Sequence, residues 1–214
     1  MDMLKTNNIE KIIDYILLVY GQSPDVSLYH GKTGIVLALM MYAKCMDSIP
    51  VRDFAEEHFN DIYVGIHDGM PVGMEYGLSG IGYGITLLKK AGLIDCDLND
   101  VLFDIDSKIM ETDPRRCKEL SFRKGLAGVV AYINLRKETE GMVTSFDSLY
   151  LNEVSIRMSK AEESVQLEMV KSLIDDIESP VWKATDYLSG SISIHQGSSY
   201  YLLKSIYDKV LFDK

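Results

Sequence analysis

The chain has 214 residues, of which 47% are hydrophobic, so it is long and apolar enough to bury a substantial core. Its formal net charge is -10, and the acidic residues are spread along the chain. Nucleic acids and anionic membranes reward clustered Lys and Arg, so we expect neither as a partner. A cationic peptide remains compatible with the charge.

Targeting signals and cysteine usage indicate a compartment. The first residues contain no basic stretch followed by an apolar signal core, and no apolar run approaches the roughly 20 residues of a membrane helix. Cys45, Cys96 and Cys117 form no CxxC motif and cannot all pair. We therefore expect a reduced, cytoplasmic protein.

Two kinds of helical segment alternate along the chain. An amphipathic helix is predicted over residues 9–20, and an apolar one over 35–43. The same order recurs as 54–66 with 81–88, 98–109 with 129–135, and 165–177 with 200–206. An amphipathic helix covers a core with one stripe, whereas a helix that is apolar all round is buried on both sides. The pattern predicts an all-α fold of about four helical hairpins, with an outer and an inner layer.

A pair of glycines precedes the inner helices. Gly31-Lys-Thr-Gly34 returns as Gly77-Leu-Ser-Gly80 and as Gly125-Leu-Ala-Gly128, at intervals of 46 and 48 residues. Such a period indicates one helical unit used several times. In the fourth copy we place Gly197 at the second glycine position and Ile194 at the first. Residues 141–159 are predicted to be a loop insertion, and no linker divides the chain, so we expect one domain over residues 1–214.

The glycine turns have two interpretations. Glycine lets neighbouring backbones approach closely, which crowded inner helices need. Alternatively, the helix starts leave unpaired N–H groups that could receive an anionic or polar ligand.

If the barrel is incomplete, the apolar flanks of its first and last inner helices are exposed, and we expect a second copy or a terminal helix to cover them.

At these residues the chain resembles the lanthionine synthetase C-like family. Ser27-Leu-Tyr-His-Gly-Lys-Thr-Gly-Ile35 is similar to that family's opening repeat, and Tyr76-Gly-Leu-Ser-Gly-Ile-Gly-Tyr-Gly84 to its commonest repeat. Ser121-Phe-Arg-Lys-Gly-Leu-Ala-Gly128 resembles a third, and residues 98–116 resemble members from Bacteroides-type bacteria. The resemblance is best supported over residues 25–140.

The resemblance implies an α/α toroid and a role in modifying ribosomally made peptides. Family cyclases add a peptide cysteine thiol to a dehydrated Ser or Thr, on a zinc ion held by two cysteines and a histidine. This chain has no Cys-Cys or Cys-His pair and about four of the seven helix pairs of a full toroid. We therefore expect a partial toroid with no metal site and no cofactor, zinc being possible only by family analogy.

Three functions stay open at this point. The first is a LanC-like protein that binds a peptide or a modifying enzyme without zinc-dependent cyclisation. The second is an active lanthionine cyclase, with His30 as the catalytic residue. The third is a self-assembling helical scaffold, in which a homodimer completes the toroid. The residues expected to contact a substrate are Gly31, Gly34, Tyr76, Gly77, Gly80, Gly125, Gly128 and His195. His58 falls on the apolar stripe of an outer helix and is interpreted as a packing residue.

Overall fold

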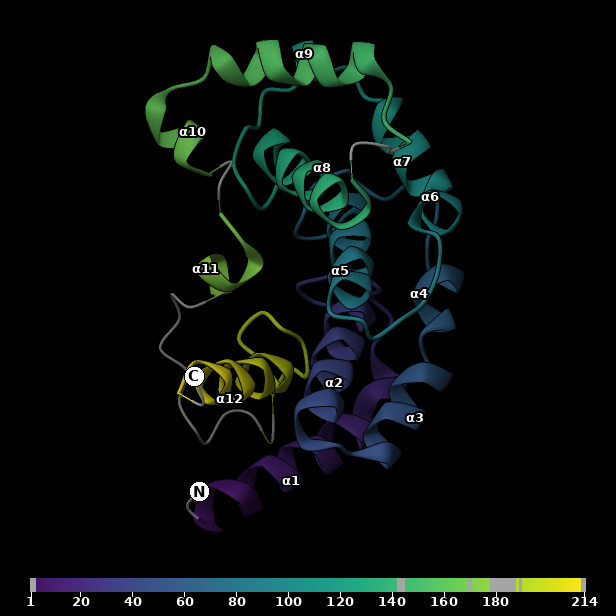
Figure 1. Ribbon diagram of the computed structural model, residues 1–214, viewed down its shortest axis with the longest axis vertical. Coiled ribbons are helices and arrows are strands. Elements are labelled where there is room, and N and C mark those ends of the chain that lie inside the picture. Colours follow the sequence, from purple (N-terminus) through teal and green to yellow (C-terminus); the bar gives the residue numbers. More distant parts are fainter. Residues whose placement is uncertain (1–2, 142–144, 169–170, 178–187, 189, 213–214) are drawn as a thin grey trace. The chain divides into compact units, whose positions relative to one another are not determined.

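The computed structural model describes residues 3–141, 145–168, 171–177, 188 and 190–212. Within these residues every regular element is a helix, which confirms the all-α class (Figure 1). Their contacts divide into two compact units. Unit 1 comprises Met1–Ile66 with Ile177–Lys214, and unit 2 comprises His67–Asp176. The toroid-like arrangement and the single domain expected over the whole chain stay predictions.

All four predicted inner helices are present. They are α2 (Lys32–Met46), α5 (Leu78–Lys90), α8 (Leu126–Glu140) and α12 (Ser198–Phe212). In α2, α5 and α8 ten residues each are buried, because these helices carry apolar side chains on nearly every face. In unit 1, α2 packs against α12, and in unit 2, α5 packs against α8.

The predicted outer helices are present but divided. The first is α1 (Met3–Val19), which continues into the short η1 (Tyr20–Gln22). The second is broken at His58 and Phe59 into α3 (Ile49–Glu57) and α4 (Asn60–Val64), and the third at Leu102 into α6 (Leu98–Val101) and α7 (Phe103–Met110). The fourth is divided into α10 (Glu163–Glu168) and α11 (Leu173–Ile177), and its residues 169–170 lie outside the described residues.

The outer helices cover the inner ones within each unit. In unit 1, α3 and α4 pack on α2, and α1 packs on α12. In unit 2, α7 packs on α5, and α10 packs on α8. The inner and outer layers predicted from the hydrophobic patterns are thus found in each unit by itself.

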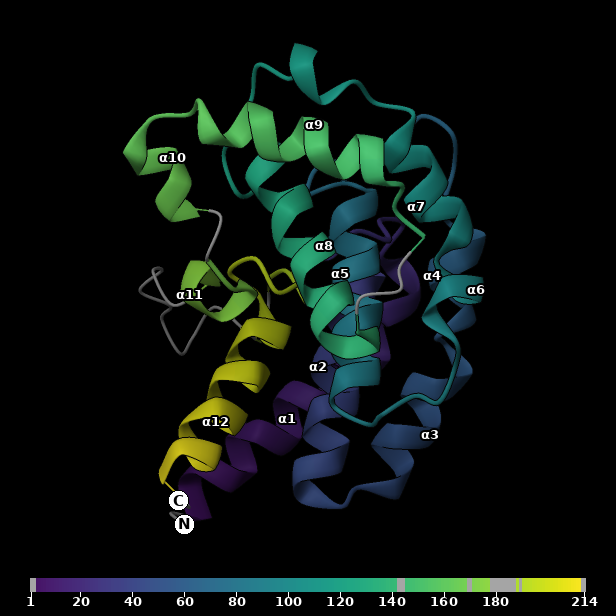
Figure 2. The same ribbon diagram turned by 45° about the horizontal axis from the view of Figure 1, so that its top comes forward.

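The loop predicted over residues 141–159 is wrong for most of that segment. Residues 148–159 form α9 (Ser148–Ser159), which packs on α8 and on η2 (Pro114–Arg116) (Figure 2). The side chain of Asp147 caps this helix by accepting a hydrogen bond from the Tyr150 N–H at 2.7 Å. Three side chains four residues apart are buried along it, Tyr150, Val154 and Met158. The Asp147 cap and this four-residue spacing are the helix signals that the sequence offers for this segment. Residues 142–144 lie outside the described residues.

The first and last inner helices, α2 and α12, pack against each other. The sequence predicts that both lack a neighbour on one flank, but α12 packs directly against α2 in unit 1. Leu202 of α12 is fully buried, as are Val36 and Leu39 of α2. The physical reason is that burying two apolar helix faces against each other removes both from water. Among the described residues, no helix combines the length and the apolar character needed to cross a lipid bilayer.

Candidate functional site

One backbone hydrogen bond defines the glycine turn and occurs in all four copies. The first helical N–H donates to the carbonyl oxygen seven residues earlier. The four bonds are Lys32 to Asp25 at 2.9 Å, Leu78 to Pro71 at 2.9 Å, Leu126 to Glu119 at 3.1 Å and Ser198 to Ser191 at 3.0 Å. Each turn therefore folds back on the start of its own inner helix.

This bond corrects the register of the fourth copy. Gly197 precedes Ser198 and so corresponds to the first glycine of the other copies, not to the second. Tyr200 holds the second position, and Ile194 lies three residues before the first. That place is apolar and buried in every copy, as Leu28, Met74, Phe122 and Ile194. Aligning this apolar residue with the glycine would have given the correct register from sequence.

Close backbone approach is what requires glycine in the turns. Gly31 has an extended backbone with φ of -125°, which any residue can adopt. A methyl group there, however, would overlap the backbone carbonyl of Asp25. At Gly34 and Gly128 a methyl group would overlap the carbonyl oxygens of Leu28 and Phe122. Close approach is thus found at these glycines, but to the backbone of each glycine's own turn rather than between neighbouring inner helices.

The helix starts offer few free donors for an anion. In α5, the N–H groups of Leu78, Ser79 and Gly80 donate to Pro71, Val72 and Gly77. In α8, the corresponding groups of Leu126, Ala127 and Gly128 donate to Glu119, Leu120 and Gly125. The turn backbone satisfies the donors that would otherwise be left over. These two helix starts therefore offer an anion few unpaired backbone donors, which favours the packing interpretation of their glycines.

In unit 1, the structure brings together the two histidines singled out from the sequence. The rings of His30 and His195 meet edge to face, with their centroids 4.8 Å apart. The two turns are also joined through their backbones, because the His195 N–H donates to the Tyr29 carbonyl at 2.8 Å. Both histidines are partly exposed, so their imidazoles are neither sealed in the core nor fully solvated. Gly34 lies against the Ile194 side chain, which belongs to the same turn as His195.

The charges beside this pair are neutralised. Lys32, which follows Gly31, forms an ion pair with Asp61 at 3.2 Å, and His58 Nδ1 lies 3.3 Å from the same carboxylate. Burial alone would raise the pKa of Asp61, but the Lys32 hydrogen bond and charge, with His58, lower it below its ordinary value. His58 also packs against the rings of Tyr20 and Phe54, in agreement with the packing role expected for it.

In unit 2, the second and third turns are joined in the same way. The Glu75 N–H donates to the Arg123 carbonyl at 2.8 Å, and these residues hold the same turn positions as His195 and Tyr29. Arg123 Nη1 lies 3.4 Å from Glu75 Oε1, and Arg123 Nε lies 2.7 Å from Asp176 Oδ2. The sequence alone does not reveal this charged cluster, because its members come from three separate segments. Tyr76, beside it in the chain, is 46% exposed.

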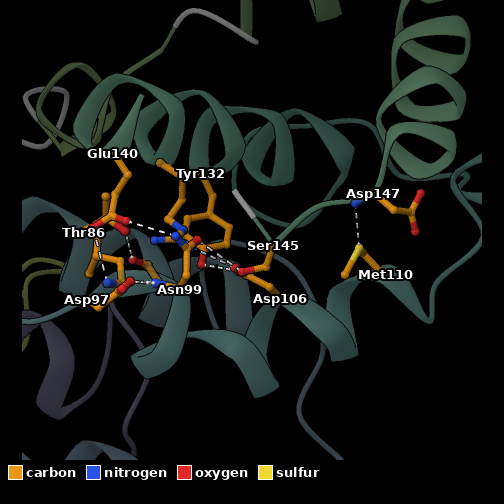
Figure 3. A network of polar contacts seen from close by, with 12 residues as sticks. Thr86, Asp97, Asn99, Asp106, Met110, Tyr132, Glu140, Ser145 and Asp147 are labelled. Atoms are coloured by element: carbon orange, nitrogen blue, oxygen red, sulfur yellow. Dashed lines mark hydrogen bonds and ion pairs between the residues drawn. The ribbon is translucent and has the colours of Figure 1, made fainter. Parts of the chain in front are cut away.

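A fully buried polar network in unit 2 has a different character. The Tyr132 hydroxyl reaches from α8 toward Asp106 of α7 and donates to its carboxylate at 2.5 Å (Figure 3). Arg136 Nη2 lies 3.1 Å from Asp106 and donates to Asn99 at 3.0 Å. Burial raises the pKa of Asp106, although Tyr132 and Arg136 act in the opposite direction. With Asp106 and Arg136 wholly inaccessible, this network joins α7 to α8 and cannot meet a substrate.

The family's zinc ligands have no counterpart among the described residues. Cys45, Cys96 and Cys117 are free thiols, and the Cys117 thiol donates to the Glu119 carbonyl at 3.0 Å. No group of three or more His, Cys, Asp and Glu side chains is placed to hold a metal ion within the described part of the chain. These residues do not fit the two-cysteine, one-histidine set of the cyclases.

No model of a known protein family matches the sequence, and no curated protein matches it significantly. The resemblance to the lanthionine synthetase C-like family therefore stays a proposal carried by the repeat residues themselves.

Proposed function

We propose that this chain is a lanthionine synthetase C-like protein that binds a peptide at the paired turns of unit 1 without zinc-dependent cyclisation. His30 and His195 are the contact residues. The observation that carries the proposal is their ring contact at 4.8 Å between turns more than 160 residues apart in the sequence. A neutral imidazole offers one donor and one acceptor, so the pair can hold polar groups of a peptide backbone or a thiol.

Two further features support this proposal. The repeat that carries the family resemblance is present in the fourth copy as well, since its turn forms the same backbone bond. The net charge of -10 favours a cationic peptide, because opposite charges increase the rate of encounter. The thiols are free, which agrees with the cytoplasmic location that we propose.

A binding assay tests the proposal directly. The probe is a fluorescent cationic peptide with one cysteine and one dehydroalanine. We expect the His30→Ala, His195→Ala double variant to weaken binding about tenfold or more, the factor that one lost hydrogen bond of about 1.4 kcal/mol produces. His67→Ala is the control, since His67 lies in unit 2, where its Nδ1 accepts from the neighbouring Gly69 N–H. The proposal would be contradicted if the wild type did not bind the peptide, or if the His30→Ala, His195→Ala variant and the His67→Ala control bound it equally well.

The same peptide separates binding from the alternative of an active cyclase. In that reaction the cysteine loses its proton to His30, sulfur bonds to the β-carbon of dehydroalanine, and the α-carbon takes up a proton. We expect the thiol to stay available for alkylation, as measured by mass spectrometry. Loss of the thiol at unchanged peptide mass, dependent on His30, would establish the cyclase instead. Stoichiometric zinc in the purified protein would also overturn the non-zinc proposal.

A homodimer that completes a toroid, as in the scaffold hypothesis, has no specific support in the described contacts. The expected opening between the first and last inner helices is filled by the packing of α2 against α12. Light scattering would detect such a dimer at once.

A further inference from the structure

The short segment 171–177 contains the helix α11 and the hydrogen bonds that cap its start. Ser172 and Asp175 form a reciprocal cap: the Ser172 N–H and hydroxyl donate to Asp175 at 2.9 and 2.7 Å, and the Asp175 N–H donates back to the Ser172 hydroxyl at 3.2 Å. These bonds lower the pKa of Asp175. The five-residue helix α11 thus contains its own start signal, although a helix of this length is not stable alone.

Two side chains of the segment, Leu173 and Asp176, contact other residues of unit 2, whereas Ile177 is assigned to unit 1. Leu173 is only 2% exposed, and its N–H donates to the Tyr83 hydroxyl of α5 at 3.4 Å. Asp176 accepts from Arg123 Nε at 2.7 Å, and its side chain is 10% exposed. Residues three apart on a helix share one face, so Leu173 and Asp176 form a single contact surface.

Part of the surface that receives them is positioned by contacts outside the segment. Glu75 positions Arg123 twice, through the backbone bond at 2.8 Å and through the side-chain contact at 3.4 Å. Tyr83 lies in α5, is 5% exposed with the segment in place, and its hydroxyl accepts from the Leu173 N–H. We call Glu75, Tyr83 and Arg123 the unit 2 turn site. Glu75 and Arg123 hold the same turn positions as His195 and Tyr29 in unit 1, whereas Tyr83 lies within α5.

We propose that Lys171–Ile177 is a tethered peptide ligand of the unit 2 turn site, and that this site takes external peptides with an aliphatic residue followed three residues later by a carboxylate. The inference rests on the proposed function in one respect, the peptide as the class of ligand. Leu173 shows what the apolar contact accepts, and Asp176 shows what Arg123 accepts. A tethered copy competes with any external peptide, since the observed affinity falls with the fraction of open sites.

The experiment uses the full chain and a fluorescent heptapeptide of the segment's own sequence, Lys-Ser-Leu-Ile-Asp-Asp-Ile. The opened variant is Leu173→Ala, Asp176→Asn. We expect it to bind the heptapeptide at least about tenfold more tightly than the wild type does, because its own segment no longer fills the site. Leu149→Ala with Asp95→Asn is the matched control, since it makes the same changes at exposed positions of unit 2.

Further controls assign the binding to the named residues. A heptapeptide with Ala and Asn at the two anchor positions should not bind, and adding Arg123→Gln to the opened variant should abolish binding. The proposal is overturned if the opened variant keeps the wild-type circular dichroism spectrum and melting temperature yet binds the heptapeptide no better than the wild type.

If the opened variant fails to fold, the proposal is tested by amide hydrogen exchange of the Tyr83→Phe variant. It removes only the hydroxyl that accepts the Leu173 N–H, so that amide should exchange its hydrogen faster, and excess heptapeptide should accelerate exchange over residues 171–177 of the wild type. Unchanged exchange in both cases overturns the proposal. The His30→Ala, His195→Ala variant should bind the heptapeptide as the wild type does, so failure of this inference and failure of the proposed function are distinguishable.

Discussion

At the scale of single residues, Arg136 and Asp106 of unit 2 form a fully buried ion pair. Both side chains are fully inaccessible, and the Arg136 Nε and Nη1 atoms have no hydrogen-bond partner among the described residues. A buried charge is tolerated only while its counter-charge stays in place. The pair therefore stabilises one arrangement of α7 and α8 more than it stabilises the fold as such.

Asp106→Asn is expected to destabilise the protein by about 3–5 kcal/mol, because it leaves the Arg136 guanidinium buried without a negative partner. The triple variant Asp106→Leu, Tyr132→Phe, Arg136→Met should recover most of that loss, since apolar side chains of similar volume need no counter-charge. Chemical denaturation measures both changes. A loss below about 1 kcal/mol for the single substitution would show that water or another group compensates the charge.

At the scale of elements, the inner helices were predictable and the outer ones only in part. A continuous apolar run after a glycine turn specifies a helix buried on both sides, and α2, α5 and α8 follow it closely. The breaks at His58 and Leu102 leave the apolar spacing intact, so periodicity does not reveal them. The register of the fourth turn was missed because the apolar run was aligned rather than the buried residue before the glycine.

The same distinction applies to the candidate site. His30 and His195 were identified from their place beside glycine turns, a local signal. The cluster of Glu75, Arg123 and Asp176 joins residues 48 and 53 positions apart in the chain. Nothing local marks these residues, since charged side chains in turns are most often solvated. Their meeting depends on which turns pair, and only the folded structure decides that.

Whether close approach requires glycine in the turns can be tested by adding one methyl group. Gly128→Ala places a Cβ against the Phe122 carbonyl and the Met74 side chain, so we expect a loss of about 1–3 kcal/mol in the free energy of unfolding. Gly21→Ala is the control, because a Cβ there meets nothing within 4 Å. Urea denaturation of both variants gives the comparison. Equal stability of the two would mean that the turn relaxes at little cost and that close approach does not require its glycine.

At the scale of the whole molecule, the contacts pair the fourth repeat with the first and the second with the third. The same backbone bond joins the copies in both units: the N–H of the residue two positions before the first glycine position donates to the carbonyl of the same position in the paired copy, as His195 does to Tyr29 and Glu75 to Arg123. The sequence shows that four repeats exist, but not which are neighbours. Repeats that follow one another in the chain are expected to pair. In unit 1 the fourth repeat pairs with the first instead, because α12 packs against α2.

The division into two units predicts that a destabilising core substitution increases local unfolding mainly in its own unit. Leu202 of α12 and Leu88 of α5 are both fully buried, so changing either to Ala should cost about 2–5 kcal/mol. Hydrogen exchange should then rise in α2 and α12 for Leu202→Ala, and in α5 and α8 for Leu88→Ala, because local opening follows contact-rich units. If each substitution instead loosens all four inner helices equally, the chain unfolds as one cooperative domain, as the sequence predicts. The exchange pattern of these two matched variants therefore decides between two units that open separately and a single domain.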